Sequence, residues 1–414
     1  MAFIYSLVIR LYVSALYTAS FFNPKARLWT EGRRGWREKL IKATAGFYKT
    51  IWVHCASLGE FEQGRPLMEK IREERPEFRI VLTFFSPSGY EIRKGWPGAD
   101  YICYLPADTA SNAKFFIETV KPEMALFIKY EFWNNYISVL YGRKIPLFLV
   151  SGIFRGDQHF FRWYGNFFRS MLNKFTHIFV QDERSAELLR SAGIERTTVT
   201  GDTRFDRVMK IARSAPLIPE MEKFGNGEKI FLAGSSWPKD EEIIARYINS
   251  RPGVMKWIFA PHETDKANIE RIEKLFTLPV IRFSDFYGSD SEARVMIIDT
   301  IGMLSSAYRY AHIAAVGGGF GKGIHNILEP ACWGIPVLFG PNHKKFREAV
   351  SLLALKGAFC FNNYDEFREI TDSLLADESL HRSASGNALS YVSANAGATE
   401  KIINVLFEKD INKR

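Results

Sequence analysis

From residue 50 onward, short runs of apolar and β-branched residues alternate with stretches in which apolar residues recur at helical spacing. This alternation is typical of α/β units with a parallel sheet. The strands predicted in the first half are Ile51–His54, Ile80–Phe84, Tyr101–Tyr104, Met124–Ile128, Leu147–Val150, Ile178–Val180 and Thr198–Thr200. Those predicted in the second half are Ile230–Ala233, Lys256–Ala260, Val280–Phe283, Val295–Ile298, Ile313–Val316 and Val337–Phe339.

The two sets of strands are separated by Ser214–Glu228, a segment rich in proline and glycine in which no apolar period survives. We therefore predict a linker at 214–228 between α/β domains at 25–213 and 229–414, with the last helix packing back on the first domain. A chain of 414 residues is too long for one compact core to be the default. Two such halves facing each other would leave a cleft, and parallel sheets bind ligands beyond the carboxyl ends of their strands.

The segment Ala2–Phe22 is apolar or aromatic almost throughout and carries one charge, Arg10. Ser6, Arg10, Ser14 and Thr18 recur every four positions, which favours a helix that lies in a membrane interface with one narrow polar stripe. About 20 mostly apolar residues could also span a bilayer, and a helix buried against its own domain is a third interpretation. A cleaved signal peptide is disfavoured because no small-residue cleavage site precedes the basic cluster. We predict a membrane-anchor helix at residues 1–24.

The formal net charge of +9 lies mainly at the N-terminus, where the first fifty residues hold nine basic and two acidic side chains. Residues 211–414 are nearly neutral. No basic groove with interleaved aromatic residues and no nucleic-acid-binding module is found, so we expect no nucleic-acid partner. Basic residues beside an apolar helix suit anionic lipid headgroups instead. The four cysteines form no closely spaced pair, which fits a reducing compartment.

Polar residues follow three predicted strands of the first half. Glu60 comes after Ile51–His54 and just before a helix predicted from about Phe61, where it could act as a general base or merely cap the helix. Glu131 follows Met124–Ile128 in a polar and aromatic cluster that suits sugar contact. Arg204 follows the last of these strands and could meet a phosphate or form a surface ion pair with Asp202 or Asp206.

The second half contains a glycine-rich loop at 317–323 between a strand and a helix predicted to open near His325 and Asn326. Backbone amides of such a loop, together with a helix N-terminus, can bind a phosphate, although the loop could also serve tight packing alone. It matches neither GxxxxGK[ST] nor the dinucleotide fingerprint. A further candidate ligand loop is Ala260–Glu263, where the single residue His262 could equally be an ordinary surface histidine.

Several of these motifs, in this order, resemble the 3-deoxy-D-manno-octulosonic acid (Kdo) transferases of lipopolysaccharide synthesis. The matching segments are Ala56–Glu60, Phe84–Tyr90, Glu131–Asn134, Gly201–Asp206 and Gly323–Pro330. The resemblance runs essentially from end to end. It implies a GT-B fold of two facing Rossmann-like domains and inverting transfer of Kdo from CMP-Kdo to a hydroxyl of the lipid A precursor at the cytoplasmic face of the inner membrane.

The resemblance also implies roles for individual residues. It places the general base on Glu60 and assistance to the transition state on Glu131 and Arg204, where the family often has lysine instead of arginine. The implied CMP contacts are Pro261, His262, Ile301, Gly302, Met303, Asn326, Ile327, Leu328 and Glu329. No cofactor or metal is expected, because the chain has no Asp-x-Asp motif and no HExxH or closely paired histidines. The alternatives are another GT-B enzyme acting on a UDP-sugar, as transferase or 2-epimerase, and a non-enzymatic membrane scaffold.

Overall fold

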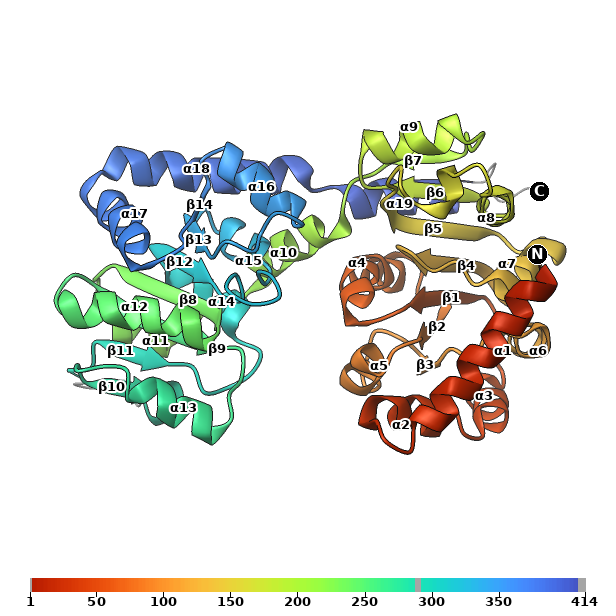
Figure 1. Cartoon of the computed structure of the whole chain (residues 1–414), viewed down its shortest axis with the longest axis horizontal. Coiled ribbons are helices and arrows are strands. Elements are labelled where there is room, and N and C mark those ends of the chain that lie inside the picture. Colours follow the sequence, from red (N-terminus) through yellow and green to blue (C-terminus); the bar gives the residue numbers. More distant parts are fainter. Residues whose placement is uncertain (1, 287–291, 409–414) are drawn as a thin grey trace. The chain divides into compact units, whose positions relative to one another are not determined.

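The computed structural model describes residues 2–286 and 292–408. Met1, at the start of the predicted anchor, and residues 409–414, at the end of the predicted second domain, lie outside the described residues. The chain forms two compact units (Figure 1). Unit 1 contains the residues up to Arg207 and those from Ala396 onward, and unit 2 is Val208–Asn395. Each unit is built on a parallel seven-stranded sheet, which confirms the predicted α/β class.

The sheet of unit 1 has the order β3-β2-β1-β4-β5-β6-β7. Its strands are β1 (Thr50–Cys55), β2 (Arg79–Phe84), β3 (Tyr101–Tyr104), β4 (Pro122–Ile128), β5 (Leu147–Gly152), β6 (His177–Val180) and β7 (Thr197–Val199). The central strand β1 is buried along its whole length and pairs with β2 and β4. Apolar clusters cover both faces, which explains why the central strands read as nearly continuous apolar runs.

Helices flank this sheet on both faces. They are α1 (Ala2–Ala19), α2 (Pro24–Glu31), α3 (Trp36–Thr44), α4 (Leu58–Glu74), α5 (Pro87–Arg93), α6 (Ala110–Val120), α7 (Asn134–Gly142), α8 (Asn166–Leu172), α9 (Glu183–Ser191), α10 (Thr203–Ser214) and α19 (Ala398–Phe407). The last of these, α19, packs Ile402 and Leu406 into the same cluster as residues of β1 and α4. Asp206 fixes its start by accepting hydrogen bonds from the backbone N–H groups of Gly397 and Thr399.

The sheet of unit 2 has the order β10-β11-β9-β8-β12-β13-β14. Its strands are β8 (Ile230–Ser236), β9 (Lys256–Pro261), β10 (Val280–Arg282), β11 (Val295–Ile297), β12 (Ile313–Val316), β13 (Val337–Phe339) and β14 (Ala358–Cys360). Its helices are α11 (Pro219–Gly225), α12 (Pro238–Ser250), α13 (Lys266–Glu273), α14 (Leu304–Ala307), α15 (Leu328–Ala331), α16 (Arg347–Ala354), α17 (Tyr364–Ala376) and α18 (Glu378–Asn395). The edge strand β14 was not predicted, because it is three residues long and only partly buried.

The segment 214–228, predicted as a linker, is a folded part of unit 2. It contains α11, whose Met221 and Phe224 are buried in a core cluster of that unit. The division between the units instead falls at Arg207 and Val208, inside α10. Two apolar side chains three positions apart are enough to dock this short helix but too few to produce a recognisable period in the sequence.

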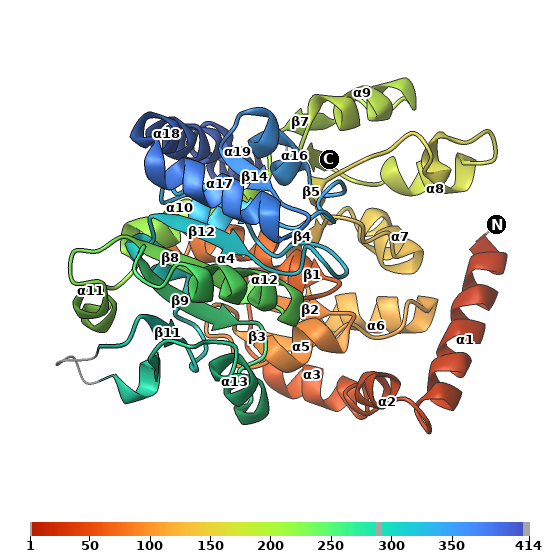
Figure 2. The same ribbon diagram turned by 60° about the vertical axis from the view of Figure 1, so that its left-hand side comes forward.

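Helix α1 lies along the outside of unit 1 (Figure 2). Most of its large apolar side chains are exposed. Phe3, Leu7 and Leu11 are exposed, whereas the hydroxyl of Tyr5 donates a 2.6 Å hydrogen bond to the buried carboxylate of Asp108. One side of the helix is therefore docked on its own domain. Among the described residues no single helix meets the length and apolarity expected of a membrane span, but α1 and α2 meet them as a pair bent by 117°.

Candidate active site

Glu60 lies in the first turn of α4, at the carboxyl end of β1. The helix begins at Leu58 and not near Phe61 as predicted, because the extended residue Ser57 stands at the N-cap position and its carbonyl already accepts a hydrogen bond from the backbone N–H of Phe61. The Ser57 hydroxyl donates a hydrogen bond to the Glu60 carboxylate. The side chain is half-buried, and the first turn of a helix favours its negative charge. The geometry thus holds a partly accessible carboxylate at the edge of the sheet.

Glu131 is a second carboxylate at the same edge, because β4 pairs directly with β1. Its side chain is buried and accepts a 2.6 Å hydrogen bond from the indole N–H of Trp133. Its Oε2 also lies 2.9 Å from Nε2 of His54, which is fully buried on β1. Burial raises the pKa of the Cys55 thiol at the end of β1, and the charges of Glu60 and Glu131 raise it further.

The ring of His54 is fixed by polar contacts on both of its nitrogens. The indole N–H of Trp52 donates to the Thr83 hydroxyl at 2.8 Å, and that hydroxyl lies 2.8 Å from Nδ1 of His54. Nδ1 of His54 also lies 3.2 Å from the backbone carbonyl of Thr83. Both ring nitrogens of His54 thus have partners, and these contacts hold the ring, and with it Glu131, in one orientation.

Arg204 stands at the start of α10, just after β7, and forms the ion pair with Asp202 that was one of its two interpretations. Its Nε lies 2.9 Å from the buried Asp202 carboxylate. The amide of Gln63 donates to the same carboxylate at 3.2 Å, and Gln63 belongs to α4, as does Glu60. The interaction therefore ties Arg204 to the helix that carries the candidate base. Asp206 takes no part in it and caps α19 instead.

In unit 2, three aromatic side chains stack beside the glycine-rich loop. The Trp237 ring lies 4.7 Å from that of His262, which in turn lies 4.5 Å from that of His325. The indole N–H of Trp237 donates to Nε2 of His325 at 2.9 Å. Burial lowers the pKa of His325, and the neighbouring His262 lowers it further. A neutral His325 can accept this hydrogen bond, so the stack forms a pre-built aromatic platform.

Asp240 links the loop after β8 to the glycine-rich loop. One of its oxygens accepts hydrogen bonds from the backbone N–H groups of Trp237, at 3.1 Å, and Gly318, at 3.0 Å. Burial raises the pKa of this carboxyl to about 6. Farther along the loop, a Cβ on Gly319 would lie 2.5 Å from the backbone nitrogen of Gly340. Tight packing therefore accounts for at least this glycine.

The residues implied as nucleotide contacts fall into three loops at the carboxyl edge of the unit 2 sheet. Pro261 ends β9 and His262 follows it, Ile301–Met303 precedes α14, and Asn326–Glu329 leads into α15. The helix does not open near His325 as predicted but begins at Leu328 and has only four residues. The glycine-rich loop delays it, because His325 still bonds through its backbone to Gly317.

Glu329 joins two of these loops. Its carboxylate accepts a hydrogen bond from the amide of Asn326 at 3.0 Å and another from the hydroxyl of Ser305, in α14, at 2.8 Å. Ile327 and Leu328 are buried, so their side chains belong to the core and only their backbones are placed to meet a ligand. Ile301, by contrast, is 90% exposed, and Gly302 has a left-handed φ of 99°.

The model of the family described as 3-deoxy-D-manno-octulosonic acid transferase matches residues 31–207. The 3-deoxy-D-manno-octulosonic acid transferase of Aquifex aeolicus is 30% identical over 315 residues, which cover 74% of this chain and 80% of that protein. The chain belongs to the Kdo transferase family. The Rickettsia bellii member is 27% identical over 86% of this chain and 87% of its own length.

Solved structures also resemble this Kdo transferase family member in fold. The UDP-GlcNAc 2-epimerase from Neisseria meningitidis, bound to UDP-GlcNAc, superposes with a TM-score of 0.61 at 16% identity and covers 87% of this chain and 99% of that one. A putative UDP-N-acetylglucosamine 2-epimerase from Listeria monocytogenes gives 0.60 at 14% identity, over 87% and 96%. Within the described ranges, no group of three or more His, Cys, Asp or Glu side chains is placed to hold a metal ion.

The structure adds residues that sequence reasoning did not single out. In unit 1 of this Kdo transferase family member they are Trp52, His54 and Thr83, which orient Glu131. In unit 2 they are Trp237, Asp240 and Ser305. Asp240 had a weak signal, since an acidic residue at the third position of a helix often accepts a hydrogen bond from the backbone of the N-cap residue, here Trp237.

Proposed function

We propose that this protein transfers Kdo from CMP-Kdo to a hydroxyl of a lipid A precursor, with inversion at the anomeric carbon. The observation that carries the proposal is the pair of carboxylates that lie beyond the carboxyl ends of two neighbouring strands of unit 1, β1 and β4. Glu60 is partly accessible, whereas Glu131 is buried and held by His54 and Trp133. Membership of the Kdo transferase family supplies the reaction class.

In the proposed step, Glu60 accepts the proton of the acceptor hydroxyl while the oxygen of that hydroxyl attacks the anomeric carbon of Kdo. The bond from that carbon to the phosphate oxygen of CMP breaks, and CMP leaves with the electron pair. Positive charge develops on the sugar ring in such a transition state, and the fixed carboxylate of Glu131 would stabilise it. Arg204 would stabilise the negative charge on the departing phosphate, and its ion pair with Asp202 would reduce this effect.

Unit 2 would bind the CMP portion of the donor. The loops that carry Pro261 and His262, Ile301 to Met303, and Asn326 to Glu329 are held at the carboxyl edge of their sheet, where parallel sheets bind nucleotides. The aromatic platform beside them can stack on a flat ligand surface. CMP carries a single phosphate, so its departure requires less charge compensation than that of a diphosphate.

We further propose that α1 attaches the enzyme to the cytoplasmic side of the inner membrane by lying in the interface. The exposed side of the helix carries Phe3, Ile4, Leu7, Val8 and Leu11. Its other side packs on unit 1 through Tyr5, so the helix can meet lipid without leaving its own domain. The basic residues that follow it in the sequence suit anionic headgroups.

The test is Kdo transfer from CMP-Kdo to a tetra-acylated lipid A precursor, with the product identified by mass spectrometry. Glu60→Gln removes the base and should slow transfer by about 10²- to 10⁴-fold. Glu73→Gln is the matched control, since Glu73 lies exposed on the same helix. Undiminished transfer by Glu60→Gln would refute the assignment of the base, and tighter binding of UMP than of CMP would favour a UDP-sugar enzyme.

A further inference from the structure

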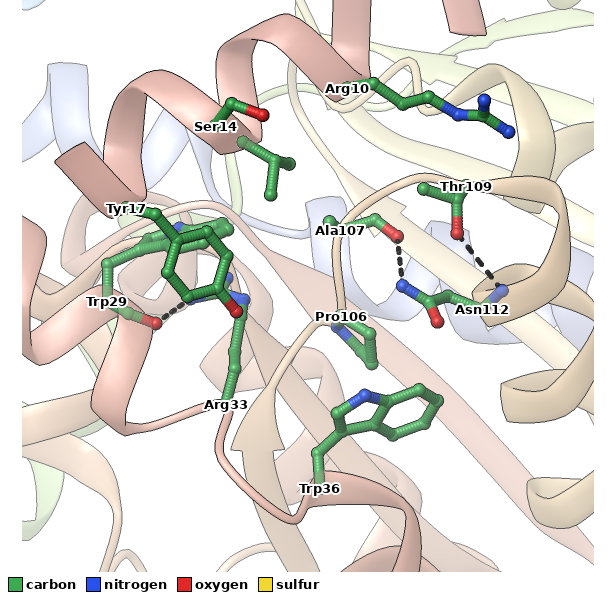
Figure 3. A pocket seen from close by; sticks show the side chains of 11 residues that line it. Arg10, Ser14, Tyr17, Trp29, Arg33, Trp36, Pro106, Ala107, Thr109 and Asn112 are labelled. Carbon is green, nitrogen blue, oxygen red and sulfur yellow. Dashed lines mark hydrogen bonds between the residues drawn. The ribbon is translucent and has the colours of Figure 1, made fainter.

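A pocket of about 410 Å³ lies between α1 and the body of unit 1 (Figure 3). Arg10, Ser14 and Tyr17 of α1 form one wall. The opposite wall comes from α2, from the segment between α2 and α3, from the start of α3, and from the segment that leads from β3 into α6. Two members of the polar stripe that the sequence showed along α1, Arg10 and Ser14, thus face this pocket. The lining residues are Arg10, Val13, Ser14, Tyr17, Trp29, Arg33, Trp36, Pro106, Ala107, Thr109 and Asn112.

The lining carries two positive charges and no carboxylate. Arg33 is buried, and its guanidinium donates to the backbone carbonyls of Leu105, Trp29 and Phe85 at 2.8, 3.0 and 2.9 Å. Its charge also lies 3.7 Å from the centre of the Trp29 ring. Burial lowers its pKa to about 9, which leaves the group charged at neutral pH. Arg10 is exposed and forms no ion pair with a described residue.

Carbonyl dipoles and aromatic faces compensate a cation only partly, so this pocket keeps a positive potential that favours an anion. Its remaining surface includes aromatic rings, among them Tyr17 and Trp36, and hydroxyl and amide groups, as on Ser14 and Asn112. Flat aromatic faces beside hydrogen-bonding groups suit a sugar ring. The lining therefore matches the chemistry of a phosphorylated sugar.

The pocket also lies close to the candidate catalytic carboxylates. The Phe85 ring is 5.8 Å from that of Trp29, which lines the pocket, and 4.7 Å from that of Trp133, which donates to Glu131. A single phenyl ring thus separates the wall of the pocket from the residues that hold Glu131. On the other side, α1 turns its apolar surface outward.

We propose that this pocket binds the phosphate monoester and the adjoining sugar of the glycolipid acceptor, with Arg10 contacting the phosphate directly. The inference rests on the proposed function, because it assigns the acceptor of that same reaction to a site. The buried residue Arg33 contributes positive potential, and the sugar packs against the aromatic rings of the lining, among them Tyr17 and Trp36. The acyl chains leave along the apolar face of α1, and the sugar hydroxyls extend toward the edge of the sheet that carries Glu60 and Glu131.

The experiment measures steady-state Kdo transfer to a phosphorylated precursor and to the same precursor with its phosphates removed. Arg10→Gln should raise the KM for the phosphorylated acceptor by about 10-fold or more, since a charge-assisted hydrogen bond to phosphate is lost. The KM for CMP-Kdo should not change. With the dephosphorylated acceptor, wild type and variant should behave alike. Arg27→Gln is the control, because Arg27 is an exposed arginine of α2 outside the pocket lining.

An equal loss with both acceptors would overturn the proposal, because the pocket would then not recognise phosphate. A parallel loss of binding to phosphatidylglycerol vesicles would also overturn it and assign Arg10 to general lipid attachment. If the wild type transfers no Kdo, the proposed function fails, and the pocket is judged by direct binding of the two glycolipids in neutral detergent micelles. A preference for the phosphorylated form that Arg10→Gln abolishes would still support the site.

Discussion

Asp240→Asn tests whether a buried carboxylate fastens the glycine-rich loop at a cost in stability. The wild-type carboxylate is almost fully buried, and its two backbone donors, Trp237 and Gly318, only partly offset the loss of hydration. Its other oxygen, Oδ1, is buried without a hydrogen-bond partner. An asparagine oxygen can accept from the same two donors without carrying a charge, so the loop geometry should be retained.

The size of the effect follows from the pKa. Burial raises the pKa of Asp240 from 3.8 to about 6. A group whose pKa is raised in the folded state contributes stability below its unfolded pKa and loses that contribution as the pH rises through the folded value. The shift of roughly two units corresponds to about 3 kcal/mol. Relative to wild type, Asp240→Asn should therefore gain up to about 3 kcal/mol in free energy of unfolding between about pH 4 and pH 7.

The measurement is urea unfolding of both proteins over this pH range, followed by circular dichroism. The difference between the two is the informative quantity, because the other titratable groups of the chain are present in both proteins. The difference should grow with pH and level off above about pH 7. A difference that stays constant across the range would show that Asp240 does not titrate there and would refute the reasoning.

Two further substitutions probe the surroundings of the carboxylates in unit 1. Gly89→Ala places a methyl group against the Phe84 ring and 3.0 Å from the carbonyl carbon of Ser57. The free energy of unfolding should therefore fall by about 1–3 kcal/mol in the same urea titration. Gly95→Ala is the control and should be neutral, because its methyl group meets nothing within 4 Å. Trp133→Phe keeps an aromatic ring beside Phe85 but removes the hydrogen bond to Glu131. The kcat should fall by roughly tenfold, whereas the KM for CMP-Kdo should not change. An unaltered kcat would contradict the role given to this hydrogen bond.

The strands of both sheets could be predicted from the sequence because central parallel strands are buried on both faces and read as apolar runs. The edge strand β14 and helix α11 could not, since each is short and owes its structure to packing against its unit. The start of α15 was misplaced for a related reason. A backbone hydrogen bond from His325 to Gly317 extends the loop, and such a contact leaves no period in the sequence.

The candidate site, too, could be predicted from the sequence only in part. Glu60 and Glu131 could be identified because each lies a few residues after the end of a strand, and parallel strands bring their carboxyl ends to one edge. The network behind Glu131 could not, because Trp52, His54 and Thr83 lie inside strands where they read as ordinary core positions. Their polar atoms meet only through the pairing of β1 with β2, in which His54 lies opposite Thr83.

The position of α19 has a consequence for the synthesis of the chain. This helix contributes Ile402 and Leu406 to the core of unit 1, yet it leaves the ribosome after the whole of unit 2. Domains generally fold as units in the order in which they emerge. Unit 1 must therefore wait, with part of its core exposed, while the inserted unit 2 is made and becomes the first to complete its fold. We expect proteins truncated before Ala398 to be captured by chaperones or degraded, whereas the internal segment 208–395 should be the more stable fragment.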